Sequence, residues 1–443
     1  MSAADGTQKG HPRGLAVLAG TELAERFSFY GMKALLVLYM VHQLLLPGTA
    51  EQVIGLGALR RLLDYRGGMS DQAFASLIYG WYSGLVYFTP LIGGWVADRL
   101  LGARRTVMLG ALLMVAGHLL MSFAATFLVA LLLLILGSGC LKGNISAQVG
   151  PLYPPEAESR RARGFTIFST GINVGATAGP LVTGALAQAY GWHAGFACAA
   201  VLMVVALVVY ATGQKHLRGK EVIAEESADA PLTGGERQRV WALLFLILVN
   251  VPIAMAYYQL SNVGVVWVEQ AGDLATPLGD VPAAWFNSID SFASILVAPV
   301  LIALWARQAR AGREPDSLMK VTIGALINTA APLVLVAGIA AAGGGKVGVG
   351  WLVGAWFLGG LAFMYYWPLT LELIASRAPA KLRSTLMGGC FLSLFAGNVL
   401  LGYVGSTFDR MSPATFWALD AAIGLVAVAM MIVAIRPMRR VLG

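Results

Sequence analysis

The segment ELAERFSFYGMK, residues 22–33, places four charged side chains within a stretch that is otherwise mostly apolar. The four are Glu22, Glu25, Arg26 and Lys33. At about 100° per residue in an α-helix, these side chains and Tyr30 fall within one arc of roughly 140°. An unpaired charge in the middle of a membrane costs about 2.5–3.5 kcal/mol even on insertion-based scales. We therefore expect a membrane-spanning helix whose charged face borders a wet interior, with the acids and bases as partners.

The composition of the whole chain favours a membrane protein. Of its 443 residues, 58% are hydrophobic and 12% are charged, against about 25% charged residues in a typical soluble domain. Residues 106–137 contain no Asp, Glu, Lys or Arg, and such a run is too long for one core helix of a soluble protein. The first apolar run lacks a cleavage-site pattern, so we expect a retained helix rather than a signal peptide.

The sequence offers no metal or cofactor motif. Its three cysteines, Cys140, Cys198 and Cys390, lie in apolar surroundings without CxxC spacing, so neither a disulfide nor a metal centre is expected. We expect no cofactor. No nucleophile–base pair is apparent either, which argues against a membrane enzyme.

Apolar runs punctuated by Pro, Gly and charged residues predict an all-α membrane protein with twelve transmembrane helices. The predicted helices cover residues 14–44, 70–98, 104–125, 127–153, 160–189, 193–213, 238–270, 282–307, 318–341, 349–377, 381–407 and 413–435. A polar linker, residues 214–237, divides the chain into an N-terminal six-helix bundle, residues 14–213, and a C-terminal one, residues 238–436. Two such halves are the layout of the major facilitator superfamily.

The basic residues predict the orientation in the membrane. Most loop Lys and Arg residues fall on the side that carries both termini, and few fall on the opposite side. Those few are Arg60, Arg61, Arg66, Lys346 and Arg410. By the positive-inside rule both termini are cytoplasmic, and we expect a multi-pass protein of a bacterial-type inner (plasma) membrane. The net charge of +8 then follows from topology, and nucleic acid is not an expected partner.

Three basic residues remain inside the predicted spans: Arg26, Lys33 and Lys142. One interpretation is a proton switch, in which Glu25 exchanges Arg26 and Lys142 as partners and its protonation frees a cation for an anionic substrate group. Proton and substrate would then each change the affinity of the other. The alternative is a set of ion pairs whose members neutralise one another and serve only to fix helix packing. We favour the switch, because uncharged residues would pack the same interface at lower cost.

Residues 22–30 resemble the ExxERFxYY signature of the proton-dependent oligopeptide transporters, the POT or PTR family of the major facilitator superfamily. Further segments that resemble the family follow in the family's order. They are the loop at residues 94–105, the GxGxxKxN pattern at 137–144, the fifth-helix pattern at 165–175, and the segments 282–286 and 378–388. The resemblance covers nearly all of the chain and implies a transporter rather than an enzyme.

The resemblance also implies roles for individual positions. Proton coupling falls to Glu22, Glu25, Arg26 and Lys142. Substrate recognition falls to Lys142, Tyr30, Lys33, Tyr87, Asn173 and Gln259. Lys33 is expected to pair with Glu269 at an outward gate. A cytoplasmic gate is expected to contain Asp98, Arg99, Arg105 and Glu372.

Four positions depart from the family pattern. Phe29 occupies a position where the family commonly has Tyr, Asp290 one where it usually has Asn, and Cys390 one where Trp is common. Phe363 lies near the position of an acid in the family's tenth helix. In the family that acid usually holds the amino terminus of the peptide. Two interpretations of Asp290 stay open: a hydrogen-bonded polar residue near a helix end, or the replacement for the missing acid, binding an ammonium group or a second proton. Glu372 could be the acid instead, although its neighbours favour the cytoplasmic gate.

The aromatic residues of the seventh and tenth predicted helices also allow two interpretations. They either belong to the membrane interface or line an apolar side-chain pocket. The residues concerned are Tyr257, Tyr258, Tyr365, Tyr366 and Trp367.

The resulting hypothesis is proton-coupled symport of di- and tripeptides into the cell by alternating access. A peptide zwitterion would lie between the cations Arg26, Lys33 and Lys142 and an opposite wall that contains Asp290, Gln259 and aromatic side chains. The expected partners are the peptide, protons and the lipid bilayer, and a monomer is expected. Two alternatives stay open: a proton-coupled transporter of another small anion or peptide-like compound, and a membrane peptide sensor that does not transport. The short loops argue against the sensor.

Overall fold

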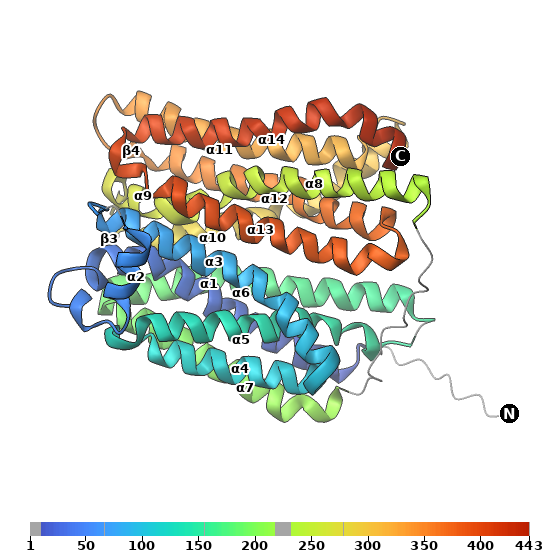
Figure 1. The fold of residues 1–443 in the computed structure, drawn as a ribbon, viewed down its shortest axis with the longest axis horizontal. Helices are drawn as coiled ribbons and strands as arrows, with labels where there is room; N and C mark the ends of the chain where they lie inside the picture. Colours follow the sequence, from blue (N-terminus) through green and yellow to red (C-terminus); the bar gives the residue numbers. More distant parts are fainter. Residues whose placement is uncertain (1–9, 66, 155, 218–231, 278, 443) are drawn as a thin grey trace.

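The computed structural model describes residues 10–442 except 66, 155, 218–231 and 278. The described chain is almost entirely helical, and its long helices run roughly along one common direction (Figure 1). The predicted linker, residues 214–237, lies largely outside the described residues. Of it, Gln214–His216 form a short 3-10 helix.

The first half of the chain forms six long helices. These are α1 (Arg13–Tyr39), α3 (Asp71–Val96), α4 (Ala103–Leu120), α5 (Phe127–Ala147), α6 (Glu158–Tyr190) and α7 (Trp192–Gly213). Two π-helical turns extend α1 and α3, namely η1 (Met40–Leu44) and η3 (Ala97–Leu101). A short amphipathic helix, α2 (Leu56–Leu63), precedes α3 and was not predicted.

The second half also forms six long helical segments, the first of which is interrupted. That segment consists of α8 (Gly234–Gln259), the π-helical turn η7 (Leu260–Gly264) and α9 (Val265–Ala271). The others are α10 (Phe286–Arg310), α11 (Ser317–Ala342), α12 (Val349–Arg377), α13 (Arg383–Gly405) and α14 (Pro413–Leu442). Four two-residue strands lie among them: β1 (Gly272–Asp273) pairs in parallel with β4 (Val347–Gly348), and β2 (Ala275–Thr276) pairs antiparallel with β3 (Gly279–Asp280).

The prediction of twelve membrane-spanning helices in an all-α fold is confirmed, since each predicted range contains one long helix or helical segment. In the described part of the chain, nine helical segments meet criteria of length and composition for a membrane span. The first helix is not among them. Its residues Glu22, Glu25, Arg26 and Lys33 lower the hydropathy of this helix and add charge to it.

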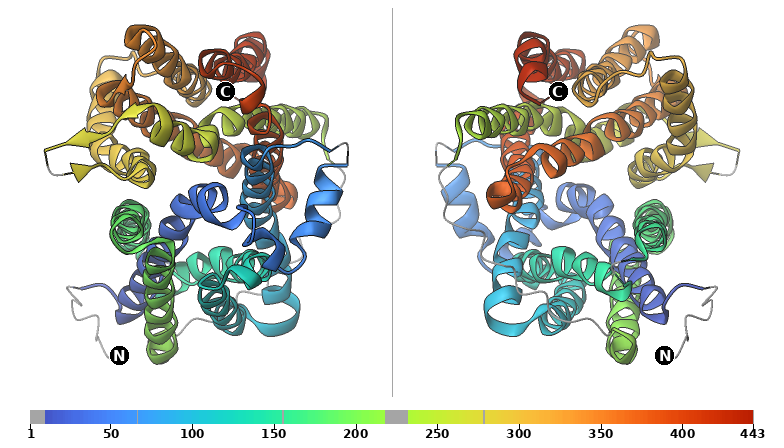
Figure 2. Two further views of the ribbon diagram at one scale, coloured as in Figure 1. Left: turned by 90° about the vertical axis from the view of Figure 1, so that its left-hand side faces the viewer. Right: turned by 90° about the vertical axis from the view of Figure 1, so that its right-hand side faces the viewer.

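The long helices group into two halves, seen end-on in Figure 2. Within the N-terminal half, α1 packs against α6 and α7, and α4 packs against α5. Within the C-terminal half, α11 packs against α12 and α14, and α13 packs against α8. Two helix pairs join the halves: α3 with α13, and α6 with α10.

The α3–α13 seam is a contact between backbones. A methyl group built on Gly80 would lie 2.7 Å from the carbonyl oxygen of Asn398 and 2.7 Å from Cα of Gly402. Because glycine has no Cβ, the two helices approach more closely here than side chains would allow.

The two ends of the bundle differ in what they carry. We call the near end the one at which α1 begins and α14 ends, and the far end the opposite one (Figure 1). The far end carries α2, α9 and the short strands. Between the two ends, the halves face each other across the charged stretch of α1.

Candidate functional site

The charged stretch of α1 forms a buried ion-pair cluster. Arg26 Nε lies 2.9 Å from Glu22 Oε1 and 2.5 Å from Glu25 Oε2. All three residues are buried, Glu25 completely. Among the described residues Arg26 Nη2 has no hydrogen-bond partner. The guanidinium therefore neutralises two acids and still has an N–H group free to donate a hydrogen bond.

Glycines of α6 let this helix lie directly against the charged cluster. A methyl group on Gly175 would stand 2.4 Å from the carbonyl oxygen of Leu23 and 2.9 Å from Cβ of Arg26. The fifth-helix pattern at residues 165–175 therefore serves close packing, which shields one side of the cluster.

The Lys142 ammonium rests on aromatic rings. From α5 its Nζ lies 4.2 Å from the ring centroid of Phe29 and 5.2 Å from that of Tyr87. Arg26 Cζ lies 5.7 Å from the same Phe29 ring. Aromatic faces attract cations through their quadrupole, so Phe29, one of the four departures, provides a shared surface for both cations. In this conformation Glu25 contacts Arg26, and its exchange with Lys142 stays a prediction.

The structure does not show the predicted pair of Lys33 and Glu269. Lys33 Nζ lies 5.1 Å from the ring centroid of Tyr79 and 5.0 Å from that of Tyr258. Glu269 pairs with His42, in η1. The reason is axial position: nine residues along a helix correspond to about 13 Å, so His42, and not Lys33, is level with α9.

A cavity of about 130 Å³ lies between the two halves at the level of Lys33. Four of the predicted binding residues line it: Tyr30, Lys33, Asn173 and Asp290. Aromatic and polar side chains complete the wall. They include Tyr257, Tyr258, Ser261, Asn287 and Phe363. Tyr257 and Tyr258 thus follow the pocket-lining interpretation of the aromatic residues.

Asp290 carries the negative charge of this cavity. Its Oδ2 accepts a hydrogen bond of 2.6 Å from the Tyr257 hydroxyl, and its Oδ1 accepts one of 2.6 Å from the backbone N–H of Ser291. Asp290 comes from α10 of the C-terminal half, whereas Lys33 comes from α1 of the N-terminal half. The cavity therefore presents an acid and a base from opposite sides.

Gln259 does not line the cavity, contrary to the prediction. It is fully buried, and its Oε1 accepts a hydrogen bond of 3.0 Å from Asn262 Nδ2, which also donates to Ser76 Oγ over 2.6 Å. Helix periodicity explains the difference. Tyr257 and Ser261, four residues apart, share the cavity face, and Gln259 between them points the other way.

Tyr87 lies at the edge of the site. Its hydroxyl is 2.8 Å from that of Tyr258, which connects the halves beside Lys142. On the C-terminal wall, the ring of Tyr257 lies 5.9 Å from that of Phe363 and 6.2 Å from that of Tyr366. Hydropathy alone could not assign these aromatic residues to the cavity, because the same residue types also favour the membrane interface.

The predicted near-end gate residues lie apart from this cavity. Asp98, Arg99 and Arg105 are exposed, and none of them forms an ion pair with another described residue. Glu372 accepts a hydrogen bond of 3.0 Å from the Ser317 hydroxyl, within the C-terminal half. Their gating role stays a prediction.

The far end is held together by hydrogen bonds between the halves. Trp285 Nε1 donates to the Leu181 carbonyl oxygen over 2.8 Å, and the Ser288 hydroxyl donates to the backbone carbonyl oxygen of Thr177 over 2.7 Å. Gln188 Nε2 donates to the carbonyl oxygen of Asp280 over 2.9 Å. These contacts join α6 to the segment that leads into α10.

The sequence and the fold both have close parallels among known proteins. The chain is 27% identical to a di-/tripeptide transporter of Lactococcus lactis subsp. cremoris, over 98% of this chain and 97% of the relative. It is 28% identical to a peptide transporter of Yersinia enterocolitica subsp. palearctica, over 98% and 96%. A crystal structure of a peptide transporter POT in complex with sulfate superimposes with a TM-score of 0.84, at 28% identity, covering 98% of this chain and 96% of that one.

A mutant of a peptide transporter POT in complex with alafosfalin gives a TM-score of 0.85, at 28% identity, over 98% of this chain and 96% of that one. The sequence model of the POT family matches residues 104–230 and 227–418, well over half of the chain. The resemblance first seen in residues 22–30 is thereby confirmed along the chain. The protein is a transporter and not an enzyme, and it belongs to the POT family.

Proposed function

We propose that this protein is a proton-coupled symporter that carries di- and tripeptides into the cell. One observation supports this most directly: the cavity between the halves presents Lys33 on one side and Asp290 on the other. A peptide at neutral pH has a carboxylate at one end and an ammonium group at the other, so it matches a cavity with both charges. The peptide transporters to which the chain is similar point to the same substrate class.

In this proposal the peptide carboxylate binds on the N-terminal side. Lys33 lines the cavity, and Lys142 and Arg26 supply positive charge nearer to the acids of α1. The peptide ammonium binds Asp290, whose carboxylate is held in place by the Tyr257 hydroxyl. The aromatic rings of Tyr257 and Phe363 form the surface for an apolar side chain.

Proton coupling follows from the cluster in which two acids share one guanidinium. When both Glu22 and Glu25 are ionised, Arg26 is held between them. Protonating one acid removes part of that attraction, so Arg26 or Lys142 becomes available to a substrate carboxylate, and the proton and the peptide bind cooperatively. One proton moving down about 100 mV supplies roughly 2.3 kcal/mol.

The arrangement of the two ends supports alternating access. The far end is joined by the hydrogen bonds of Trp285, Ser288 and Gln188, whereas the near-end residues Asp98 and Arg99 are exposed. We assign the near end to the cytoplasm, because the loops there carry most of the basic residues. The protein would lie as a monomer in a bacterial-type inner membrane, with units 14–213 and 238–436 joined by the linker 214–237.

Uptake into proteoliposomes tests this function. The purified protein is reconstituted, a proton gradient is imposed, and accumulation of a labelled hydrolysis-resistant dipeptide is measured with and without an ionophore. We expect uptake that requires the gradient and that other di- and tripeptides inhibit. Absence of both gradient-driven uptake and peptide counterflow would reject the proposal.

A second candidate substrate class rests on Phe363, which occupies a cavity position near the missing tenth-helix acid. An apolar ring at that position offers no negative charge to an ammonium group, which favours a small anion or a peptide-like compound over a free amino terminus. The same assay decides between them. If N-acetylated or amine-free analogues compete better than free dipeptides, the second class is correct.

A further inference from the structure

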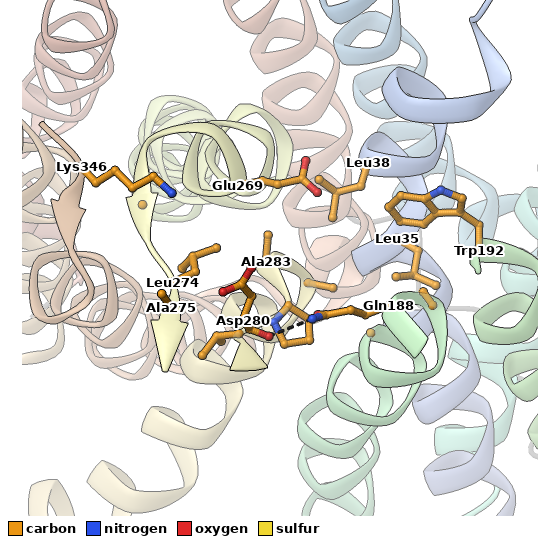
Figure 3. A pocket seen from close by; sticks show the side chains of 16 residues that line it. Leu35, Leu38, Gln188, Trp192, Glu269, Leu274, Ala275, Asp280, Ala283 and Lys346 are labelled. Carbon is orange, nitrogen blue, oxygen red and sulfur yellow. Dashed lines mark hydrogen bonds between the residues drawn. The ribbon is translucent and has the colours of Figure 1, made fainter. Parts of the chain in front are cut away.

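A second cavity lies directly beyond the central one, toward the far end. Its volume is about 290 Å³. Figure 3 shows Glu269, Asp280 and Lys346 of the C-terminal half extending toward this space, opposite Trp192 and Gln188 of the N-terminal half. We call it the outer cavity.

The two cavities are stacked along the same structural elements. On α1 the central cavity is lined by Lys33 and Ala34, and the outer one by Leu35 and Leu38. Four residues along a helix correspond to about 6 Å, so the outer cavity begins where the central one ends. The first turn of α10 and the residues just before it repeat this order, with Asn287 of α10 in the central cavity and Ala284 in the outer one.

A thin layer of contacts separates the two spaces. It consists of the Trp285 and Ser288 hydrogen bonds to α6 and of the close approach of Gly184 to Ala284 and Trp285. A methyl group on Gly184 would lie 3.0 Å from Cβ of Ala284 and 3.1 Å from Cδ1 of Trp285. Because this layer belongs to the contacts that close the far end, a solute approaching from that end reaches the outer cavity first.

The lining of the outer cavity repeats the chemistry of the central one. Both spaces carry carboxylate and ammonium groups, here Glu269 and Asp280 with Lys346, beside apolar and aromatic surface from Leu38 and Trp192. One acid is already engaged, since Glu269 pairs with His42. Asp280 uses its backbone carbonyl toward Gln188. Within the described part of the chain its carboxylate and the Lys346 ammonium form no ion pair, so they are left for an ammonium group and a carboxylate of a ligand.

We propose that the outer cavity is a staging site for zwitterionic peptides, with Asp280 and Lys346 binding the two termini before the far end opens. This inference rests on the proposed function and adds a second, weaker site on the same pathway. Exposed charges at the edge of a site act mainly on the rate of association and on its salt dependence. Staging should therefore raise the rate of capture from outside without changing the maximal rate.

The test compares cells that express the wild type with the double variant Asp280→Asn/Lys346→Gln. Both changes keep the backbone, including the Gln188 hydrogen bond. Initial uptake of a labelled dipeptide from the medium is measured over a range of concentrations and at low and high salt. Asp273→Asn and Arg410→Gln are matched controls, because both residues are exposed charges outside the cavity lining.

We expect the double variant to lose about three- to tenfold in kcat/KM with kcat unchanged, and to lose much of the salt dependence of wild-type uptake. Equal protein in the membrane and an equal melting temperature show that the variant is folded. A wild-type concentration dependence in the double variant, or the same loss in the controls, would overturn the proposal.

A binding measurement separates this proposal from the proposed function. Saturation-transfer NMR with an unlabelled dipeptide needs no transport and is applied to the purified variant Lys33→Gln/Asp290→Asn, whose central cavity has lost both charges. Residual contact with the dipeptide that disappears when Asp280→Asn/Lys346→Gln is added supports the staging site. Absence of residual contact, or contact that the outer substitutions leave unchanged, rejects it, whether or not the wild type transports peptides.

Discussion

The two walls of the central cavity hold their charges in different ways. The N-terminal wall continues along α1, beyond the residues that line the cavity, into a cluster whose acids and bases neutralise each other, with Arg26 between Glu22 and Glu25. On the C-terminal wall, Asp290 is held by a tyrosine hydroxyl and a backbone N–H. The first wall can exchange protons and partners, because its members compensate one another. The second offers one fixed acid to a ligand. From this comparison we propose that proton coupling belongs to the first wall and substrate discrimination to the second.

Removing an acid from the N-terminal wall should have the largest effect. In Glu25→Gln we expect proton-driven accumulation to vanish while peptide counterflow continues. With one proton per neutral peptide, about 2.3 kcal/mol per 100 mV corresponds to roughly fiftyfold accumulation, which would fall to unity. Paired uptake and counterflow assays in proteoliposomes measure this, and Glu25→Asp, which keeps an acid, is the control. Undiminished accumulation in Glu25→Gln would show that the walls are not divided in this way.

Removing the acid from the C-terminal wall should affect recognition instead. A hydrogen bond to a charged group contributes about 1.5–3 kcal/mol, so Asp290→Asn should weaken binding of free dipeptides about tenfold or more. N-acetylated dipeptides, which lack the ammonium group, should bind with equal affinity to the wild type and to Asp290→Asn. Competition against labelled substrate measures the two affinities.

The neighbouring hydroxyl serves as a matched control for the carboxylate. Tyr257→Phe removes one donor from Asp290 and leaves the negative charge in the cavity. Its loss of affinity should be smaller than that of Asp290→Asn. If Asp290→Asn weakens acetylated and free peptides equally, the carboxylate serves packing rather than recognition.

The aromatic surface under Lys142 should have an intermediate effect. A cation on an aromatic face gains about 0.5–2 kcal/mol, so Phe29→Leu should raise KM several-fold, and Phe29→Tyr, which keeps the ring, should not. Uptake kinetics measure both. Phe88→Leu is the control, because the Phe88 ring packs on Phe395 instead. Equal effects of the two leucine substitutions would refute a specific role for the cation.

The His42–Glu269 pair at the far end should have the smallest effect. An exposed ion pair contributes about 0.2–1 kcal/mol, and this one exists only while His42 is protonated. Its contribution to far-end closure is therefore present at low pH and lost as the pH rises. His42→Gln should open the far end slightly at pH about 5.5 and leave it unchanged at pH about 8.

Spin labels on both sides of the far end can measure this opening. Ile54 and Val349 are exposed labelling positions on the two halves, with the native cysteines replaced. The distance distribution between the labels is compared at the two pH values. A pH response that His42→Gln leaves intact would assign the response to other groups.

The helices and the family could be predicted from the sequence, because apolar length and charge position determine membrane spans. Of the charged face of residues 22–33, Lys33 lines the cavity between the halves, whereas Glu22, Glu25 and Arg26 are buried beside it within the N-terminal half. The predicted pairing of Lys33 with Glu269 is wrong, since Glu269 pairs with His42, and this has a second cause besides axial position. A π-helical turn, η7, lies between the cavity face of α8 and Glu269, and its extra residue rotates everything after it by about 100° relative to a regular helix. Gln259, directly before η7, points away from the cavity.

The C-terminal wall was the least predictable region for another reason. The hydrogen bond between Tyr257 and Asp290 joins two helices, α8 and α10. Spacing within one helix carries no information about such a contact. The N-terminal cluster, in contrast, lies within α1, where residues three and four apart are neighbours by geometry alone.

The contact of Gly80 with the α13 backbone bears on how the halves move. Side chains can swing away when two helices separate, but backbones in contact have nothing to retract and can only roll over one another. We therefore expect the α3–α13 seam to act as a hinge axis, around which the α6–α10 seam would open and close. A bulky residue at Gly80 would shift the axis itself, so that both ends of the bundle respond to a substitution that touches neither cavity.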